Sequence, residues 1–84
     1  MTRIEVAWTS ESGLSGRAAE GSAPRGSIEL LGIAARAGAV AYAMAHEAGG
    51  TAQVCVGEEG DETQHVIYRA GHGPLTDAHE DLPL

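Results

Sequence analysis

The chain has 84 residues, a hydrophobic fraction of 43% and a formal net charge of −7 at pH 7, which predict one small globular domain and exclude wholesale disorder. All five basic residues are arginine, so chemistry that depends on a lysine amine is excluded. The negative charge also opposes direct binding to nucleic acid, because contacts to phosphates need a basic surface.

Two strands are predicted before the first long loop. Ile4, Val6 and Trp8 alternate with polar or small residues, which is typical of a half-buried strand over residues 3–9. A turn follows, and residues 14–20 can return as a second strand, although glycine and alanine have low strand propensity. Residues 21–27 contain proline, glycine and serine, and they are expected to form a loop.

A long helix is predicted from Ser27 to about Ala48. Ser27 suits the N-cap position, and Glu29 lies where an acidic side chain favours the helix dipole. Gly49 and Gly50 end the helix, because glycine readily adopts the left-handed conformation that closes it.

This helix has more apolar surface than one small sheet can cover. One apolar stripe contains Leu30, Ile33, Ala37, Val40, Met44 and Ala48, and a nearly opposite stripe contains Ile28, Leu31, Ala35, Tyr42 and His46. Between the stripes lie small residues whose spacing lets another backbone approach closely. We therefore expect an oligomer interface, in a homodimer, made of Ala34, Gly38, Ala41, Tyr42 and Ala45. The alternative is that the C-terminal tail folds back and covers the helix.

The cellular setting is predicted from the cysteine count and the apolar run. A single cysteine excludes an internal disulfide, and the N-terminal residues are typical of a strand and not of a secretory leader. The apolar run over residues 30–45 contains Arg36 and is shorter than the roughly 20 residues that a membrane span needs. We expect a cytoplasmic protein that does not bind a membrane.

The last third predicts a β-hairpin followed by an irregular segment. Alternation at Ala52, Val54 and Val56 indicates a strand, an acidic turn follows, and residues 63–70 form its partner. Residues 71–84 contain two prolines and are expected to be an irregular or partly disordered acidic tail beyond a domain of residues 1–70. The predicted fold is α+β, with a small antiparallel sheet in ββαββ order and the long helix packed across one face.

The predicted hairpin tip carries four carboxylates, at Glu58, Glu59, Asp61 and Glu62. Carboxylates this close repel one another unless a positive group lies near. Their spacing does not fit a calcium-binding loop, so we interpret them as a contact for another protein with a basic surface. The alternative is a solvated turn that aids solubility.

Catalytic and metal chemistry lacks the spacing that it needs. Cys55 has only His65, on the partner strand, as a base that could activate its thiol. The four histidines and Cys55 include no close pair of the kind that zinc sites use. We therefore expect no catalytic residue, no metal site, no cofactor and no enzymatic activity.

A binding function remains after these exclusions. The leading hypothesis is a small acidic protein-binding module that inhibits or regulates a partner with a basic surface, such as the inhibitors of nucleic-acid enzymes that phages and mobile elements encode. The alternative is a homo-oligomeric subunit that binds a small ligand between helix and sheet without catalysis, through Arg17, Arg25 and His46.

Overall fold

The computed structural model describes residues 1–71 and 78–79 and shows one antiparallel sheet crossed by one helix. The elements are β1 (Thr2–Thr9), β2 (Ser15–Ala23), α1 (Ile28–Ala48), β3 (Thr51–Glu58), β4 (Gln64–Gly71) and β5 (Ala78–His79). The predicted α+β fold and the ββαββ order of the first five elements are confirmed. β2 is longer than the predicted second strand, because it pairs with β1 along its length despite the low propensity of its residues.

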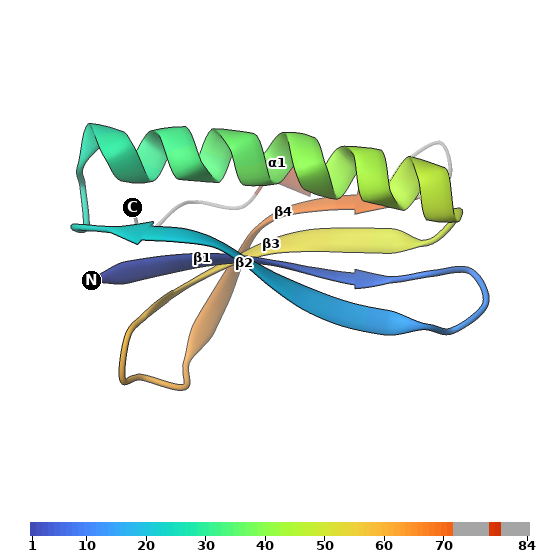
Figure 1. Ribbon diagram of the computed structural model, residues 1–84, viewed down its shortest axis with the longest axis horizontal. Coiled ribbons are helices and arrows are strands. Elements are labelled where there is room, and N and C mark those ends of the chain that lie inside the picture. The colour runs from blue at the N-terminus through green and yellow to red at the C-terminus, as the bar shows by residue number, and fades with distance from the viewer. Residues whose placement is uncertain (72–77, 80–84) are drawn as a thin grey trace.

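The strands lie in the order β2-β1-β3-β4-β5, and every neighbouring pair is antiparallel. Figure 1 shows α1 lying along one face of this twisted sheet, while the β3–β4 hairpin bends away from the helix. We call the opposite face the open face, since none of the described elements covers it. The described fold therefore has two layers, and each layer presents one outer surface to its surroundings.

Both predicted ends of the helix are confirmed. The hydroxyl oxygen of Ser27 accepts a hydrogen bond from the backbone nitrogen of Leu30 at 3.1 Å. Gly49 closes α1 with a φ of 69°, in the left-handed region. At Gly50 a Cβ atom would overlap the carbonyl oxygen of Thr9, so only glycine lets the chain pass this close to β1 before β3 begins.

The core lies between α1 and the sheet. Its fully buried large side chains are Ile4 and Val6 of β1, Val54 and Val56 of β3, and Leu30 of α1. The rest of the buried helix face is alanine: Ala37, Ala41 and Ala45 are at most 1% exposed. Because alanine has a short side chain, the helix approaches the sheet closely along its second half.

This packing corrects the predicted interface. Ala41 and Ala45 face the sheet of their own chain and are buried there, while Ala34 and Gly38 are half-buried. Of the five residues predicted to form the interface, Tyr42 is clearly on the outer side, with 46% of its surface exposed. The buried part of this ridge, Ala41 and Ala45, therefore packs within the chain and is not available to a second copy.

The predicted tail contains one described element. β5 pairs with β4, with His79 opposite Tyr68 and Ala78 opposite Arg69. Gly71 is the last residue of β4 and so belongs to the folded domain. Residues 72–77 and 80–84 lie outside the described residues. The prediction that the tail covers the helix concerns these residues and therefore stays a prediction.

Candidate functional site

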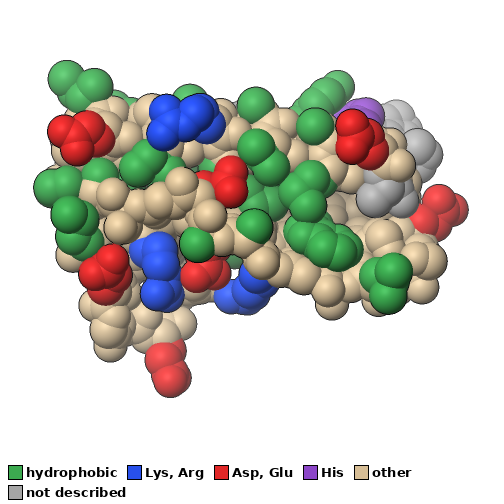
Figure 2. All heavy atoms as spheres, viewed as in Figure 1, with side chains coloured by type: hydrophobic (Ala, Val, Ile, Leu, Met, Phe, Trp, Pro, Cys, Tyr) green, Lys and Arg blue, Asp and Glu red, His purple; other side chains and the backbone are tan. Residues whose placement is uncertain are grey.

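The outer face of α1 carries apolar side chains beyond those that the sheet covers, as the sequence predicted. Ile28 is 87% exposed, Leu31 52% and Tyr42 46%. Figure 2 shows hydrophobic side chains along the upper edge of the molecule, where α1 lies, with acidic side chains near them. The outward position of the second apolar stripe is thus confirmed for these side chains.

Tyr42 and His46 form a stacked pair on this face. Their ring centroids are 4.0 Å apart, and the planes differ by 27°. The Nδ1 atom of His46 donates a hydrogen bond to the carbonyl oxygen of Tyr42 at 2.9 Å, which fixes the imidazole against the helix. The pair therefore offers a flat, partly ordered surface to a binding partner, at a reduced entropic cost.

By length and composition alone, α1 also resembles a membrane-crossing helix. Residues Ile28–Glu47 span 20 residues with a mean hydropathy of 1.4. A helix that covers a sheet passes the same test, and in this fold the side of α1 centred on Leu30 and Ala41 packs against β1 and β3.

The acidic hairpin tip is partly engaged within the chain. Glu58 accepts a hydrogen bond from the hydroxyl of Thr2, and its carboxylate lies 3.6 Å from the N-terminal amine. Asp61 accepts a hydrogen bond from the backbone nitrogen of Thr63 at 2.8 Å, which lowers the pKa of its carboxyl group. Asp61 therefore stabilises the hairpin turn and Glu58 links β3 to the start of β1, whereas Glu59 and Glu62 are exposed.

The three residues of the predicted ligand site lie in three different places. Arg17 is on the open face, on β2. Arg25 lines a small pocket of about 170 Å³ beside the acidic hairpin, together with Glu58 and Asp61. His46 is on the outer face of α1. The space between helix and sheet is filled by the apolar core, so these residues do not share a ligand there.

Cys55 and His65 do not form a catalytic pair. The strand register places Cys55 opposite Val66, whereas His65 lies opposite Val56 and therefore on the other face of the sheet. Cys55 is only 3% exposed, and burial raises the pKa of its thiol, against the opposing effect of Arg17. Over residues 1–71 and 78–79, no group of three or more histidine, cysteine or acidic residues could hold a metal ion.

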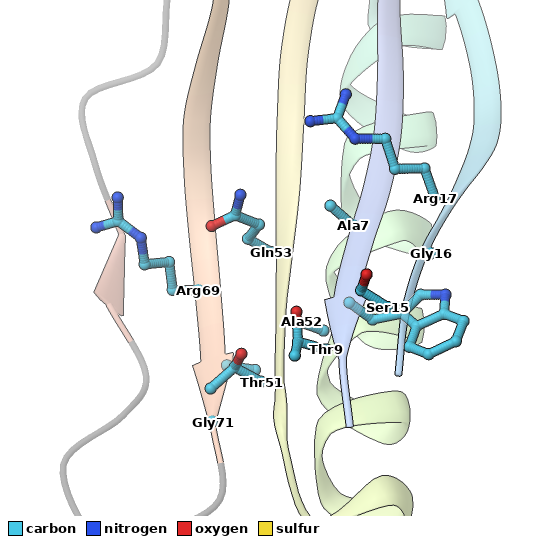
Figure 3. Close-up of a pocket in the computed structure, with 12 residues that line it drawn as sticks. Ala7, Thr9, Ser15, Gly16, Arg17, Thr51, Ala52, Gln53, Arg69 and Gly71 are labelled. Carbon is cyan, nitrogen blue, oxygen red and sulfur yellow. The ribbon is translucent and has the colours of Figure 1, made fainter. Parts of the chain in front are cut away.

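A hollow of about 590 Å³ on the open face brings polar side chains together from four strands (Figure 3). One row of residues in register crosses the sheet as Arg17 of β2, Ala7 of β1, Gln53 of β3 and Arg69 of β4. The next row on this face, nearer the β1–β2 turn, contains Ser15, Thr9 and Thr51, followed by Gly71. The hollow therefore has an arginine at each side, with small or hydroxyl side chains along its floor.

Arg17 is positioned by polar neighbours on the same face. Its Nη1 atom donates to Oε1 of Gln64 at 3.1 Å and to the carboxylate of Glu5 at 3.4 Å. Glu5 also lies 3.2 Å from Nε of Arg3. Both contacts of Arg17 use Nη1, so its Nε and Nη2 groups have no hydrogen bond to the described part of the chain and can serve a ligand.

Sequence reasoning selected Arg17 but missed Gln53 and Arg69. Alternation along β1 and β3 places Ala7 and Gln53 on the face opposite the core, and that signal was readable. The face on which Arg69 lies could not be predicted from the sequence, because the β3–β4 register shifts between Val54 and Cys55.

No protein-family model, curated protein or solved structure matches this chain. The arguments for function therefore depend on the geometry of these surfaces alone.

Proposed function

We propose that this protein is a small, non-catalytic, protein-binding module that regulates a partner with a basic surface, and that the outer face of α1 is its contact surface. The observation that carries the proposal is the exposure of Ile28, Leu31 and Tyr42 on one side of a helix whose other side already covers the sheet. Contiguous apolar surface of this kind in a soluble domain commonly marks a protein interface.

The residue types on this face support the same function. Tyrosine is enriched at protein interfaces, because its ring supplies a large contact area and its hydroxyl can still form a hydrogen bond. Leu31 and Ile28 add aliphatic surface one helical turn apart, which suits a hydrophobic contact at the centre of an interface.

The acidic surface supports a basic partner. The chain carries a net charge of −7, and Glu29 and Glu47 lie on α1 beside the apolar face. Glu59 and Glu62 add exposed carboxylates at the hairpin tip. An acidic surface accelerates association with a basic partner and repels acidic proteins. Each exposed ion pair nevertheless contributes little to the affinity.

The test is affinity capture from the native cell with two matched leucine variants. Leu31→Ser changes the outer face of α1, whereas Leu14→Ser removes a leucine that is 68% exposed in the β1–β2 turn. We expect the wild type and Leu14→Ser to capture the same partner protein from the cell, and Leu31→Ser to fail to capture it. Binding should weaken as salt concentration rises, and Glu59→Gln with Glu62→Gln should slow association.

The fold and the mass of the free protein are controls for this test. Circular dichroism must show that both leucine variants are folded, since each change is at an exposed position. A mass of two chains in solution that falls to one in Leu31→Ser would assign the same face to a homodimer. Equal capture by wild type and Leu31→Ser would contradict the proposed contact surface.

A further inference from the structure

β2 forms one edge of the sheet, and the outward side of this strand is open in the described part of the chain. It pairs with β1 alone, so alternate backbone N–H and C=O groups along its outer side have no strand partner among residues 1–71 and 78–79. The opposite edge differs, since β5 pairs with β4 there. An unpaired edge strand is a template for an added strand, because the added chain satisfies these backbone groups.

The first half of β2 lacks the features that usually protect a sheet edge. Lysine, proline and β-bulges are the common means of preventing edge pairing. Residues 15–19 contain neither lysine nor proline, and they pair regularly with β1, because the register shift of β2 comes beyond Ala19. The one charged side chain in this half, Arg17, donates to Glu5 and Gln64 and therefore extends across the open face and not outward from the edge. This half of β2 can accept another strand.

The side of β2 that faces α1 is only partly covered. Gly16 and Ala18 lie opposite Trp8 and Val6 in the register, so they face the helix. A Cβ atom on Gly16 would lie 2.7 Å from the Cζ2 atom of Trp8, which shows that the indole ring extends over Gly16 toward the edge. Ala18 faces the helix and is nevertheless exposed, so α1 does not cover β2 at this position.

An apolar hollow of about 310 Å³ lies on this side of the sheet, below the C-terminal part of α1. It is lined by Trp8, Thr9, Met44, Glu47 and Thr51. Trp8 and Met44 are half-buried, so both retain apolar surface for a contact, and Figure 2 shows hydrophobic side chains between the helix and the strands below it. A side chain of an added strand opposite Gly16 would lie about 5 Å from that position and would contact the ring of Trp8.

The charge beside the hollow is negative. Glu47 lines it, and the carboxylate of Glu11 lies against Gly49 at the C-terminal end of α1. The helix dipole adds partial negative charge at this end. Among the described residues that line the hollow, none is basic. The charge therefore favours a basic partner and opposes a second copy of this chain, whose net charge is also −7.

We infer that β2 binds an extended segment of a basic partner protein as an added strand along residues 15–19. An apolar side chain of that segment lies against Trp8 and Met44, and a lysine or arginine lies beside Glu47. Backbone hydrogen bonds to the edge give affinity, and the hollow gives specificity. The inference rests on the proposed function for its class of partner, but it uses a surface other than the outer face of α1.

The test is selection from a phage-displayed library of random peptides with the full chain as target, followed by titration of an enriched peptide that lacks tryptophan. We expect enriched sequences that alternate apolar residues with lysine or arginine. Binding should shift the fluorescence of Trp8, the only tryptophan, to shorter wavelength, because its half-buried ring becomes covered.

Two further measurements report on strand pairing itself. Hydrogen exchange should slow at amides of residues 15–19 on binding, because their outward N–H groups become hydrogen-bonded. N-methylation of the peptide backbone should abolish binding, since it removes the donors that strand pairing needs.

Two pairs of variants locate the bound peptide. Ala18→Arg and Ala19→Arg add the same charge at neighbouring exposed positions, the first on the helix side of β2 and the second on the open face. Ala18→Arg should weaken binding about tenfold or more, because it blocks burial of an apolar side chain, and Ala19→Arg should weaken it less. Glu47→Gln should weaken binding more than Glu29→Gln, which removes the same charge at the other end of α1.

Three results would overturn the inference: no enriched peptide, an enriched peptide that leaves Trp8 and residues 15–19 unchanged, or equal binding by Ala18→Arg and Ala19→Arg. A free protein of two chains that Ala18→Arg converts to one chain would assign a second copy to this edge and would also overturn it. Leu31→Ser should bind the peptide as the wild type does, so failure of this site and failure of the proposed contact on the outer face of α1 are distinguishable.

Discussion

The neighbouring residues Leu30 and Leu31 should respond very differently to the same truncation. Leu30 is 0% exposed under the helix, whereas Leu31 is 52% exposed on its outer face. Replacing a buried leucine by alanine removes its transfer free energy and leaves a cavity, which costs about 2–5 kcal/mol. Leu31→Ala should change the free energy of unfolding by no more than about 0.5 kcal/mol.

The expected loss of stability in Leu30→Ala is large relative to the total stability of the domain. A domain of 84 residues has a stability of about 4–13 kcal/mol. With a urea m-value of about 1 kcal/mol/M, Leu30→Ala should lower the midpoint of unfolding by roughly 2–5 M or leave the protein unfolded. Urea titration followed by circular dichroism at the helix band measures both variants against the wild type. Equal midpoints for Leu30→Ala and Leu31→Ala would refute the assignment of the two helix faces.

Two further predictions concern buried positions. Ala41→Glu should unfold the protein, because an unpaired carboxylate in the core costs several kcal/mol, whereas Ala43→Glu at an exposed position should keep the circular dichroism of the wild type; two folded variants would show that Ala41 is not buried. Cys55 should react slowly with iodoacetamide at neutral pH until urea unfolds the chain, because burial raises the pKa of its thiol. The folded state then holds this proton more tightly than the unfolded state, so stability should fall as pH rises above about 8.5, and Cys55→Ala should remove that part of the decline. Fast labelling of the native protein would contradict the burial of Cys55.

Features set by neighbouring residues were predictable from the sequence. The two ends of α1 follow from the hydroxyl group of Ser27 and the left-handed backbone of Gly49, both of which act within one helical turn. The alternation in β1 and β3 identified Ile4, Val6, Val54 and related positions as core, because a strand exposes its two faces in turn.

The orientation of the helix was harder to predict, since both of its faces are apolar. The buried side is centred on Leu30, Ala37 and Ala41, and it leaves Leu31 and Tyr42 outside. A helical wheel ranks faces by hydrophobicity and by size, but here close approach to the sheet selects alanine. The assignment of Ala41 and Ala45 to an outer interface was wrong for this reason.

The hollow on the open face depends on contacts between distant parts of the chain. Arg17 and Arg69 are brought into one row by three strand pairings, and the β3–β4 pairing contains a register shift. A shift of one residue would place Arg69 on the other face of the sheet. Local patterns cannot fix this register, so the site becomes visible only in the folded structure.

The most direct test of the proposed protein contact is cross-linking from the outer face of α1. A photoreactive residue placed at position 31 should form a covalent adduct with one protein in the native cell, and mass spectrometry identifies that protein. The same residue at position 14, which is also exposed, should not form this adduct. The proposal predicts a specific adduct from position 31 to a protein with a basic surface. Absence of any specific adduct from position 31, or the same adducts from both positions, would contradict it.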